Sequence, residues 1–88
     1  MPKLVLEIHF IKKAHKLLKK YPELDPKLSK VLDLLQKNPF LRSLKTHSLT
    51  GKLKGKYACS LSSKLRIVFN LSDNNIHLLN IGSHDEVY

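Results

Sequence analysis

The stretch Lys64–Leu71, which reads KLRIVFNL, decides the fold that the sequence predicts. Read with a period of two, one of its faces is entirely apolar and consists of Leu65, Ile67, Phe69 and Leu71. Residues of these types suit a strand that packs on a core. The opposite face carries Arg66. We therefore expect the central strand of a sheet, with a core on one side and a fixed cation on the other.

The segments on either side of this strand predict the rest of the architecture. Working outward, we expect strands at 57–61, 76–81 and 3–9, and amphipathic helices at 10–21 and 25–37. The turn signatures Ser62–Ser63 and Ser72–Asn75 separate the last three strands, whereas residues 39–55 carry little periodicity. The order β-α-α-β-β-β predicts an α+β fold. In this fold a two-helix hairpin packs on one face of a small, mainly antiparallel four-stranded sheet.

Length and composition limit the possible classes of protein. The 88 residues are expected to form one domain, residues 1–88. The lone cysteine, Cys59, excludes an internal disulfide framework and is expected to be a small core residue. The sequence shows neither a membrane-spanning run nor a signal peptide, so we expect a cytoplasmic protein that does not engage a membrane.

The charge distribution points to a polyanionic partner. Sixteen Lys and Arg oppose seven Asp and Glu, which gives a formal net charge of +9. A solvated lysine surface is the plainer explanation for the lysine face of the first helix. Between Asp33 and Asp73, however, the sequence contains no acid and eight bases: Lys37, Arg42, Lys45, Lys52, Lys54, Lys56, Lys64 and Arg66. This acid-free stretch favours phosphate binding.

Four segments of the sequence together resemble a known family: Asn38–Phe40, Leu44–Gly55, Leu65–Phe69 and Ile81–Tyr88. They resemble the RelE/YafQ toxins, which belong to the RelE/StbE group of the ParE/RelE superfamily. These proteins are the toxic halves of bacterial type II toxin–antitoxin systems. The loop HSLTGKLKG and the ending GSHDEVY are the most specific parts of the resemblance.

The resemblance implies an activity and its partners. It implies an mRNA interferase, a ribosome-dependent endoribonuclease that cuts mRNA in the ribosomal decoding site. The ribose 2′-OH attacks the adjacent phosphate and leaves a 2′,3′-cyclic phosphate, with no cofactor and no metal. The positive charge further suggests a cognate antitoxin with an acidic, partly disordered segment that folds on binding.

The chemistry requires a base, an acid and cations that hold developing charge. By resemblance, His47 and His84 are the acid–base candidates, Arg66 binds the phosphate, and Tyr88 stacks on or orients the RNA. The predicted RNA-binding lysines are Lys45, Lys52, Lys54, Lys56 and Lys64. Which histidine is the acid and which the base is left open.

The sequence departs from the YafQ pattern at two positions and leaves alternatives open. Ser60 stands where YafQ-like proteins carry a further histidine, and Lys64 replaces an acidic residue before the central strand. Arg66 could instead form a structural ion pair with Glu7 or Asp85. Two other functions are considered: a non-catalytic basic module that binds RNA or the ribosome, and a ParE-like toxin that acts on a topoisomerase.

Overall fold

The elements of the chain follow the predicted order, with additional short elements between the two long helices and after the second one. The computed structural model describes residues 2–88. The α-helices are α1 (Ile8–Lys20), α2 (Asp25–Lys37) and α3 (His84–Val87). The strands are β1 (Lys3–Leu6), β2 (His47–Ser48), β3 (Tyr57–Ser60), β4 (Leu65–Ser72) and β5 (Asn75–Ser83). Short 3-10 helices occupy Pro22–Leu24 (η1), Arg42–Leu44 (η2) and Gly51–Leu53 (η3).

The strands form one sheet in the order β1-β5-β4-β3-β2. Strand β1 runs parallel to β5, and the other neighbouring pairs are antiparallel. The predicted central strand, β4, is indeed the middle one. The predicted count of four strands is wrong, because the described chain has five. The missed strand, β2, is two residues long and pairs with Tyr57 and Ala58, so it leaves almost no periodic signal.

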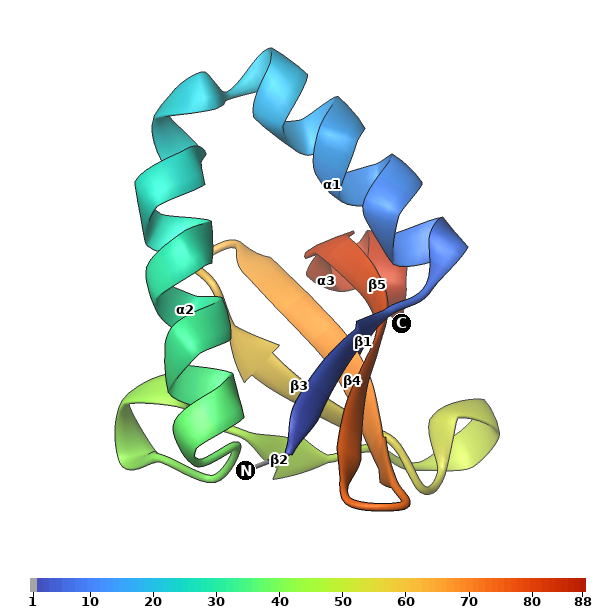
Figure 1. Cartoon of the computed structure of the whole chain (residues 1–88). Helices are drawn as coiled ribbons and strands as arrows, with labels where there is room; N and C mark the ends of the chain where they lie inside the picture. Colours follow the sequence, from blue (N-terminus) through green and yellow to red (C-terminus); the bar gives the residue numbers. More distant parts are fainter. Residues whose placement is uncertain (1) are drawn as a thin grey trace.

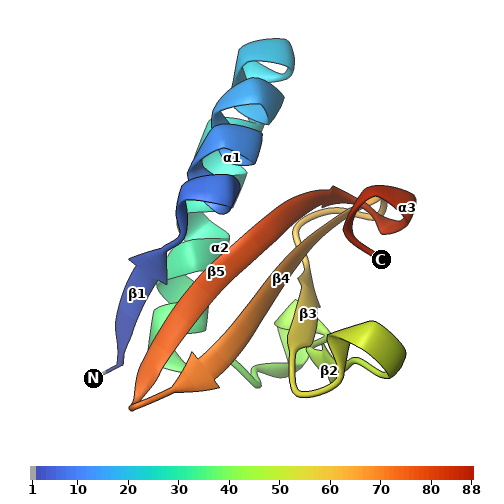
Figure 2. The ribbon, with the colours of Figure 1, turned by 90° about the vertical axis from the view of Figure 1, so that its right-hand side faces the viewer.

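Helices α1 and α2 form a hairpin on one face of the sheet (Figures 1 and 2). Phe10 from α1 and Leu35 from α2 are buried in one core with Ile67 and Phe69 of β4. Ile67 and Phe69 belong to the apolar face predicted for 64–71, and Phe10 and Leu35 lie in the two predicted amphipathic helices. The α+β fold with a helical hairpin on a mainly antiparallel sheet is therefore confirmed. None of the helices within residues 2–88 is long and apolar enough to cross a membrane.

Some predicted boundaries and faces are wrong. Helix α1 begins at Ile8 rather than residue 10, so β1 is shorter than predicted, and β5 continues to Ser83 rather than ending at residue 81. Leu71 is 39% exposed because it lies near the tip of the β4–β5 hairpin, whose turn residues Asp73 and Asn74 have φ of 53° and 62°. That turn was predicted, since Asp and Asn tolerate positive φ.

The second face of the sheet is also partly buried, whereas the sequence analysis predicted a core on one face only. Val68 was assigned to the cation-bearing face, yet it is only 2% exposed. It packs with Ala58 of β3 and Val87 of α3 in a small second cluster. The cluster exists because α3 folds back over the sheet on the side away from α1 and α2 (Figure 2). This short helix brings the end of the chain onto the face that carries Arg66.

Candidate active site

Arg66 lies near the start of β4 on the face opposite the helical hairpin. Its register partners are Ser60 on β3 and Gly82 on β5. Its Nη1 donates to the carbonyl oxygens of Ser62 at 2.7 Å, Leu65 at 3.0 Å and Ser63 at 3.4 Å. The β3–β4 connection therefore fixes one side of the guanidinium. Within residues 2–88, no hydrogen bond engages Nε or Nη2, so these donors remain for a ligand.

The two acids considered as partners of Arg66 are engaged elsewhere. Glu7 Oε1 lies 3.4 Å from Nδ1 of His77, and Asp85 Oδ1 lies 3.6 Å from Nδ1 of His84. A structural ion pair of Arg66 with Glu7 or Asp85 is thus not formed. Glu7 is instead the partner of His77 on β5.

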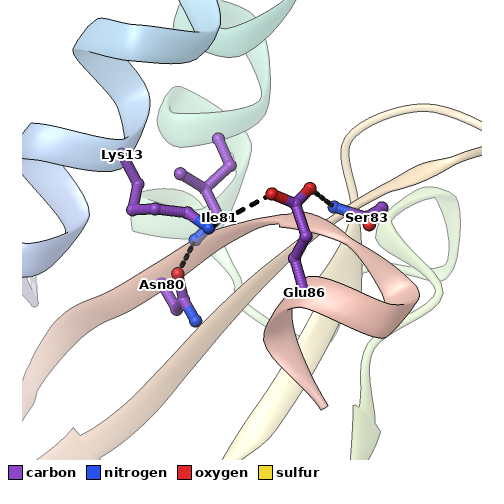
Figure 3. A network of polar contacts seen from close by, with 5 residues as sticks. All are labelled: Lys13, Asn80, Ile81, Ser83 and Glu86. Carbon is purple, nitrogen blue, oxygen red and sulfur yellow. Dashed lines mark hydrogen bonds and ion pairs between the residues drawn. The ribbon is translucent and has the colours of Figure 1, made fainter.

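Helix α3 is held by a capping box that the sequence analysis did not use. Glu86 Oε1 accepts a hydrogen bond from the Ser83 N–H at 2.9 Å, and Glu86 Oε2 lies 3.5 Å from Nζ of Lys13 on α1 (Figure 3). The Ser83 N–H is the main cause of the lowered pKa of Glu86, followed by the Ser83 hydroxyl and Lys13. The spacing Ser-x-x-Glu was a signal that could have predicted this helix start.

Gly82 provides the room for this cap. A Cβ at Gly82 would lie 3.0 Å from Glu86 Oε1 and 3.2 Å from Glu86 Cβ. Gly82 is also the register partner of Arg66, so α3 begins directly after the residue that pairs with Arg66 on β4. The small residue therefore lets α3 close over the sheet next to Arg66.

Tyr88 joins the two predicted catalytic histidines. Its hydroxyl lies 3.4 Å from Nε2 of His47, and its ring meets the ring of His84 edge to face, with centroids 4.3 Å apart. His47 is placed by β2, which pairs it with Ala58 on β3. Its Nδ1 lies 3.3 Å from the carbonyl oxygen of Lys45. Residues 47, 84 and 88, which are far apart in the sequence, thus form one cluster.

Burial keeps two groups near Arg66, the Tyr88 phenol and the Cys59 thiol, in their protonated forms. Burial is the main reason why the pKa of Tyr88 is raised, and the positive charge of Arg66 opposes this shift. Tyr88 is therefore a neutral phenol at pH 7, able to donate a hydrogen bond. Burial raises the pKa of the Cys59 thiol to about 12, so Cys59 is an inert core residue as predicted.

The predicted RNA-binding lysines do not all lie together. Lys52 shares a hollow of about 340 Å³ with Tyr88, and Lys45 shares a cleft of about 550 Å³ with Arg66. Lys54 is exposed and ends η3, while Lys56 is half-buried before β3. Lys64 lines a different hollow, beside Tyr21.

The metal-binding side chains of residues 2–88 do not gather into a metal site. Within residues 2–88, no group of three or more His, Cys, Asp or Glu side chains is placed to hold an ion. Ser60, where the resemblance places a histidine in YafQ-like proteins, is the register partner of Arg66 and contributes a hydroxyl there.

This fold and cluster define a class: a small toxin-like α+β protein with a basic, histidine-containing face on a helix-backed sheet. The chain belongs to the YafQ family, described as bacterial toxins of type II toxin–antitoxin systems, and matches it over residues 3–88. Among curated protein sequences, none is similar enough to count as a match.

Solved structures show the same architecture. A copper-bound mutant toxin from Helicobacter pylori is 32% identical over 100% of both chains, with a TM-score of 0.87. YafQ from E. coli is 21% identical over 100% of this chain and 99% of that chain, with a TM-score of 0.84. The toxin in a DinJ–YafQ complex from E. coli has a TM-score of 0.82 at 21% identity, again over 100% and 99% of the two chains. The chain is thus a type II toxin by family.

Proposed function

We propose that this toxin is a ribosome-dependent endoribonuclease that cuts mRNA in the decoding site. One observation carries the proposal: His47, His84 and Tyr88 converge on the sheet face that also bears Arg66. A surface that only bound RNA would need cations but not two imidazoles in contact with one phenol. The combination instead suits acid–base chemistry at a phosphodiester.

The reaction needs only groups that the chain supplies. One imidazole takes the proton of the ribose 2′-OH, and the 2′-oxygen forms a bond to the adjacent phosphorus. The bond from phosphorus to the 5′-oxygen breaks, and the second imidazole gives that oxygen a proton. The products are a 2′,3′-cyclic phosphate and a 5′-hydroxyl, with no metal in any step.

Arg66 and Tyr88 have supporting roles in this scheme. The free Nε and Nη2 donors of Arg66 suit the phosphoryl oxygens, where negative charge grows in the transition state. Tyr88 is neutral, so it orients an imidazole or the RNA rather than acting as an anionic base. Lys45, Lys52, Lys54, Lys56 and Lys64 would hold flanking phosphates, although Lys64 lines a separate hollow beside Tyr21.

The natural inhibitor would be a cognate acidic antitoxin. DinJ–YafQ complexes show that a structural relative assembles with a second protein. The net charge of +9 on this chain favours a partner segment rich in Asp and Glu.

Inducing the protein alone tests the proposal. We expect growth arrest, with mRNAs cut within translated regions and 2′,3′-cyclic phosphates at the new ends. Sequencing of 5′-hydroxyl and cyclic-phosphate ends detects the cuts directly. The Arg66→Ala variant, produced at the same level, is the matched control and should leave transcripts intact.

Growth arrest with intact transcripts would overturn the nuclease proposal. Accumulated double-strand DNA breaks in those cells would then indicate action on a topoisomerase. Arrest with stalled but uncut mRNA would indicate a module that only binds the ribosome.

A further inference from the structure

A cleft of about 550 Å³ lies between α2, residues 43–45 and the β3–β4 connection. Arg66, Lys45 and two lysines of α2, Lys27 and Lys30, line it. No Asp or Glu is among its lining residues in the described chain. Lys27 and Lys30 lie outside the acid-free stretch of sequence, so neither was predicted to bind RNA. We call this feature the α2 cleft.

The α2 cleft has an apolar floor and a polar rim. Val31, Leu44 and Leu61 line it and are 7%, 1% and 2% exposed. Hydroxyl-bearing residues surround the floor: Ser43, Ser60, Ser62 and Ser63. Its volume lies in the range of clefts that take small ligands, about 300–1,000 Å³. An apolar floor beneath cations and hydroxyls suits a nucleotide, which has an apolar base face and a charged phosphate.

The cations of the α2 cleft are available to a ligand. Lys27 and Lys30 are three residues apart on α2, so they lie on the same side of the helix, and both are exposed. Within residues 2–88, neither lysine forms an ion pair or a side-chain hydrogen bond. Strand β2 pairs only with Tyr57 and Ala58, so it does not cover the end of β3 that borders the cleft. The α2 cleft is therefore open to solvent, and no acidic side chain among its described lining residues neutralises its positive charge.

We propose that the α2 cleft holds the mRNA nucleotide that flanks the scissile phosphate on one side, with its phosphate on Lys27 and Lys30. The proposal rests on the nuclease function proposed above. Arg66 makes the two sites continuous, because it lines the cleft and also lies on the sheet face that bears the His47–Tyr88–His84 cluster. A strand of mRNA held by Arg66 would thus have one neighbouring phosphate within the cleft. An apolar floor beneath cations favours RNA, whose bases have an apolar face, over an acidic peptide.

The test measures binding separately from cutting. Ribosomes are programmed with mRNA that carries a 2′-deoxynucleotide at the cut site, because this mRNA cannot be cleaved. A neutral methylphosphonate then replaces one phosphodiester at a time on either side of the cut. The Lys27→Ala/Lys30→Ala variant should bind unmodified mRNA about tenfold more weakly than wild type. One methylphosphonate position should weaken wild type by a similar factor and leave the variant unaffected.

A matched variant controls for the loss of charge. Lys16→Ala/Lys19→Ala removes the same charge at the same spacing from the other helix, α1, where both lysines are exposed. It should bind within about twofold of wild type at moderate salt, where distant surface charges are screened. The two variants should match each other in thermal unfolding, because each loses the same charge and all four lysines are exposed.

Three results would overturn the α2 cleft as an mRNA site. Equal losses in the two double variants would indicate a general effect of charge. A loss in Lys27→Ala/Lys30→Ala that adds to every methylphosphonate effect would place the lysines on ribosomal RNA or on a protein. Unchanged affinity would exclude any role in binding. Wild-type protein that cuts no all-ribose mRNA on ribosomes would instead refute the proposed nuclease function itself.

Discussion

At the scale of single residues, His84 offers the sharpest separation of binding from chemistry. Its ring contacts Tyr88 at the end of the chain, and its side chain is otherwise largely exposed. We expect His84→Ala to leave ribosome association nearly unchanged. Single-turnover cleavage should fall by roughly 10²–10⁴-fold, the usual effect of losing a general acid or base. Quench-flow measurement with saturating programmed ribosomes would provide both values.

Two further variants complete that experiment: a double variant that also lacks His47, and a control at His15. Because the two imidazoles act in one step, the His47→Ala/His84→Ala variant should lose less than the product of the two single losses. His15 is exposed on α1, so His15→Ala should cleave as wild type does. A His84→Ala variant that cleaves at the wild-type rate would remove His84 from the chemistry, leaving Arg66 and the lysines to act by positioning alone.

At the scale of elements, the cap of α3 is stronger while Glu86 is ionised, because the Ser83 N–H and Lys13 both favour the carboxylate. The lowered pKa of Glu86 means that its carboxylate stabilises the folded helix fully above the ordinary pKa of the group. That stabilisation is lost as the pH falls through the lowered, folded pKa. We therefore expect amide protection of residues 84–88, measured by hydrogen exchange, to decline in acid while the core strands remain protected.

Substitution of Glu86 should separate the cap from the charge. Glu86→Ala removes the acceptor for the Ser83 N–H, so α3 should fray at neutral pH and cleavage should fall with it. Glu86→Gln keeps an acceptor in the capping box but not the charge, so at neutral pH its α3 should be protected about as much as that of wild type in acid. The protection in Glu86→Gln should then not change with acid pH. Equal protection of α3 in Glu86→Ala and wild type would show that packing of Val87, not the cap, holds the helix.

At the scale of the whole molecule, charge repulsion opposes folding. The net charge of +9 is confined to a chain with a Cα radius of gyration of 12.0 Å. Raising NaCl from about 10 mM to about 1 M shortens the Debye length from about 30 Å to about 3 Å. We therefore expect the Tm in differential scanning calorimetry to rise with salt, because screening relieves the repulsion.

A charge-reversed control distinguishes this effect from other actions of salt. Lys16→Glu/Lys19→Glu lowers the net charge to +5, since each substitution changes the charge by two. Its Tm should depend less on NaCl than that of wild type. The same salt dependence in both proteins would show that the repulsion is not what limits stability.

Periodicity in the sequence determined the layers of this fold. The alternation in 64–71 predicted β4 as the middle strand, and the periodicity of 10–21 and 25–37 predicted two amphipathic helices that cover its apolar face. These features follow from local geometry, because side-chain direction repeats every two residues in strands and every 3.6 in helices. The family resemblance, carried by short motifs, selected His47, Arg66, His84 and Tyr88.

Only the tertiary structure decided how those residues meet. Strand β2 is too short to leave a pattern, yet its pairing with β3 places His47. Helix α3 needs Gly82 for space and the Ser83–Glu86 cap for its start before Tyr88 can reach His47. The α2 cleft joins Lys27 and Lys30 to Arg66 across separate elements. Such contacts depend on packing between distant segments, and no local period in a single sequence encodes them.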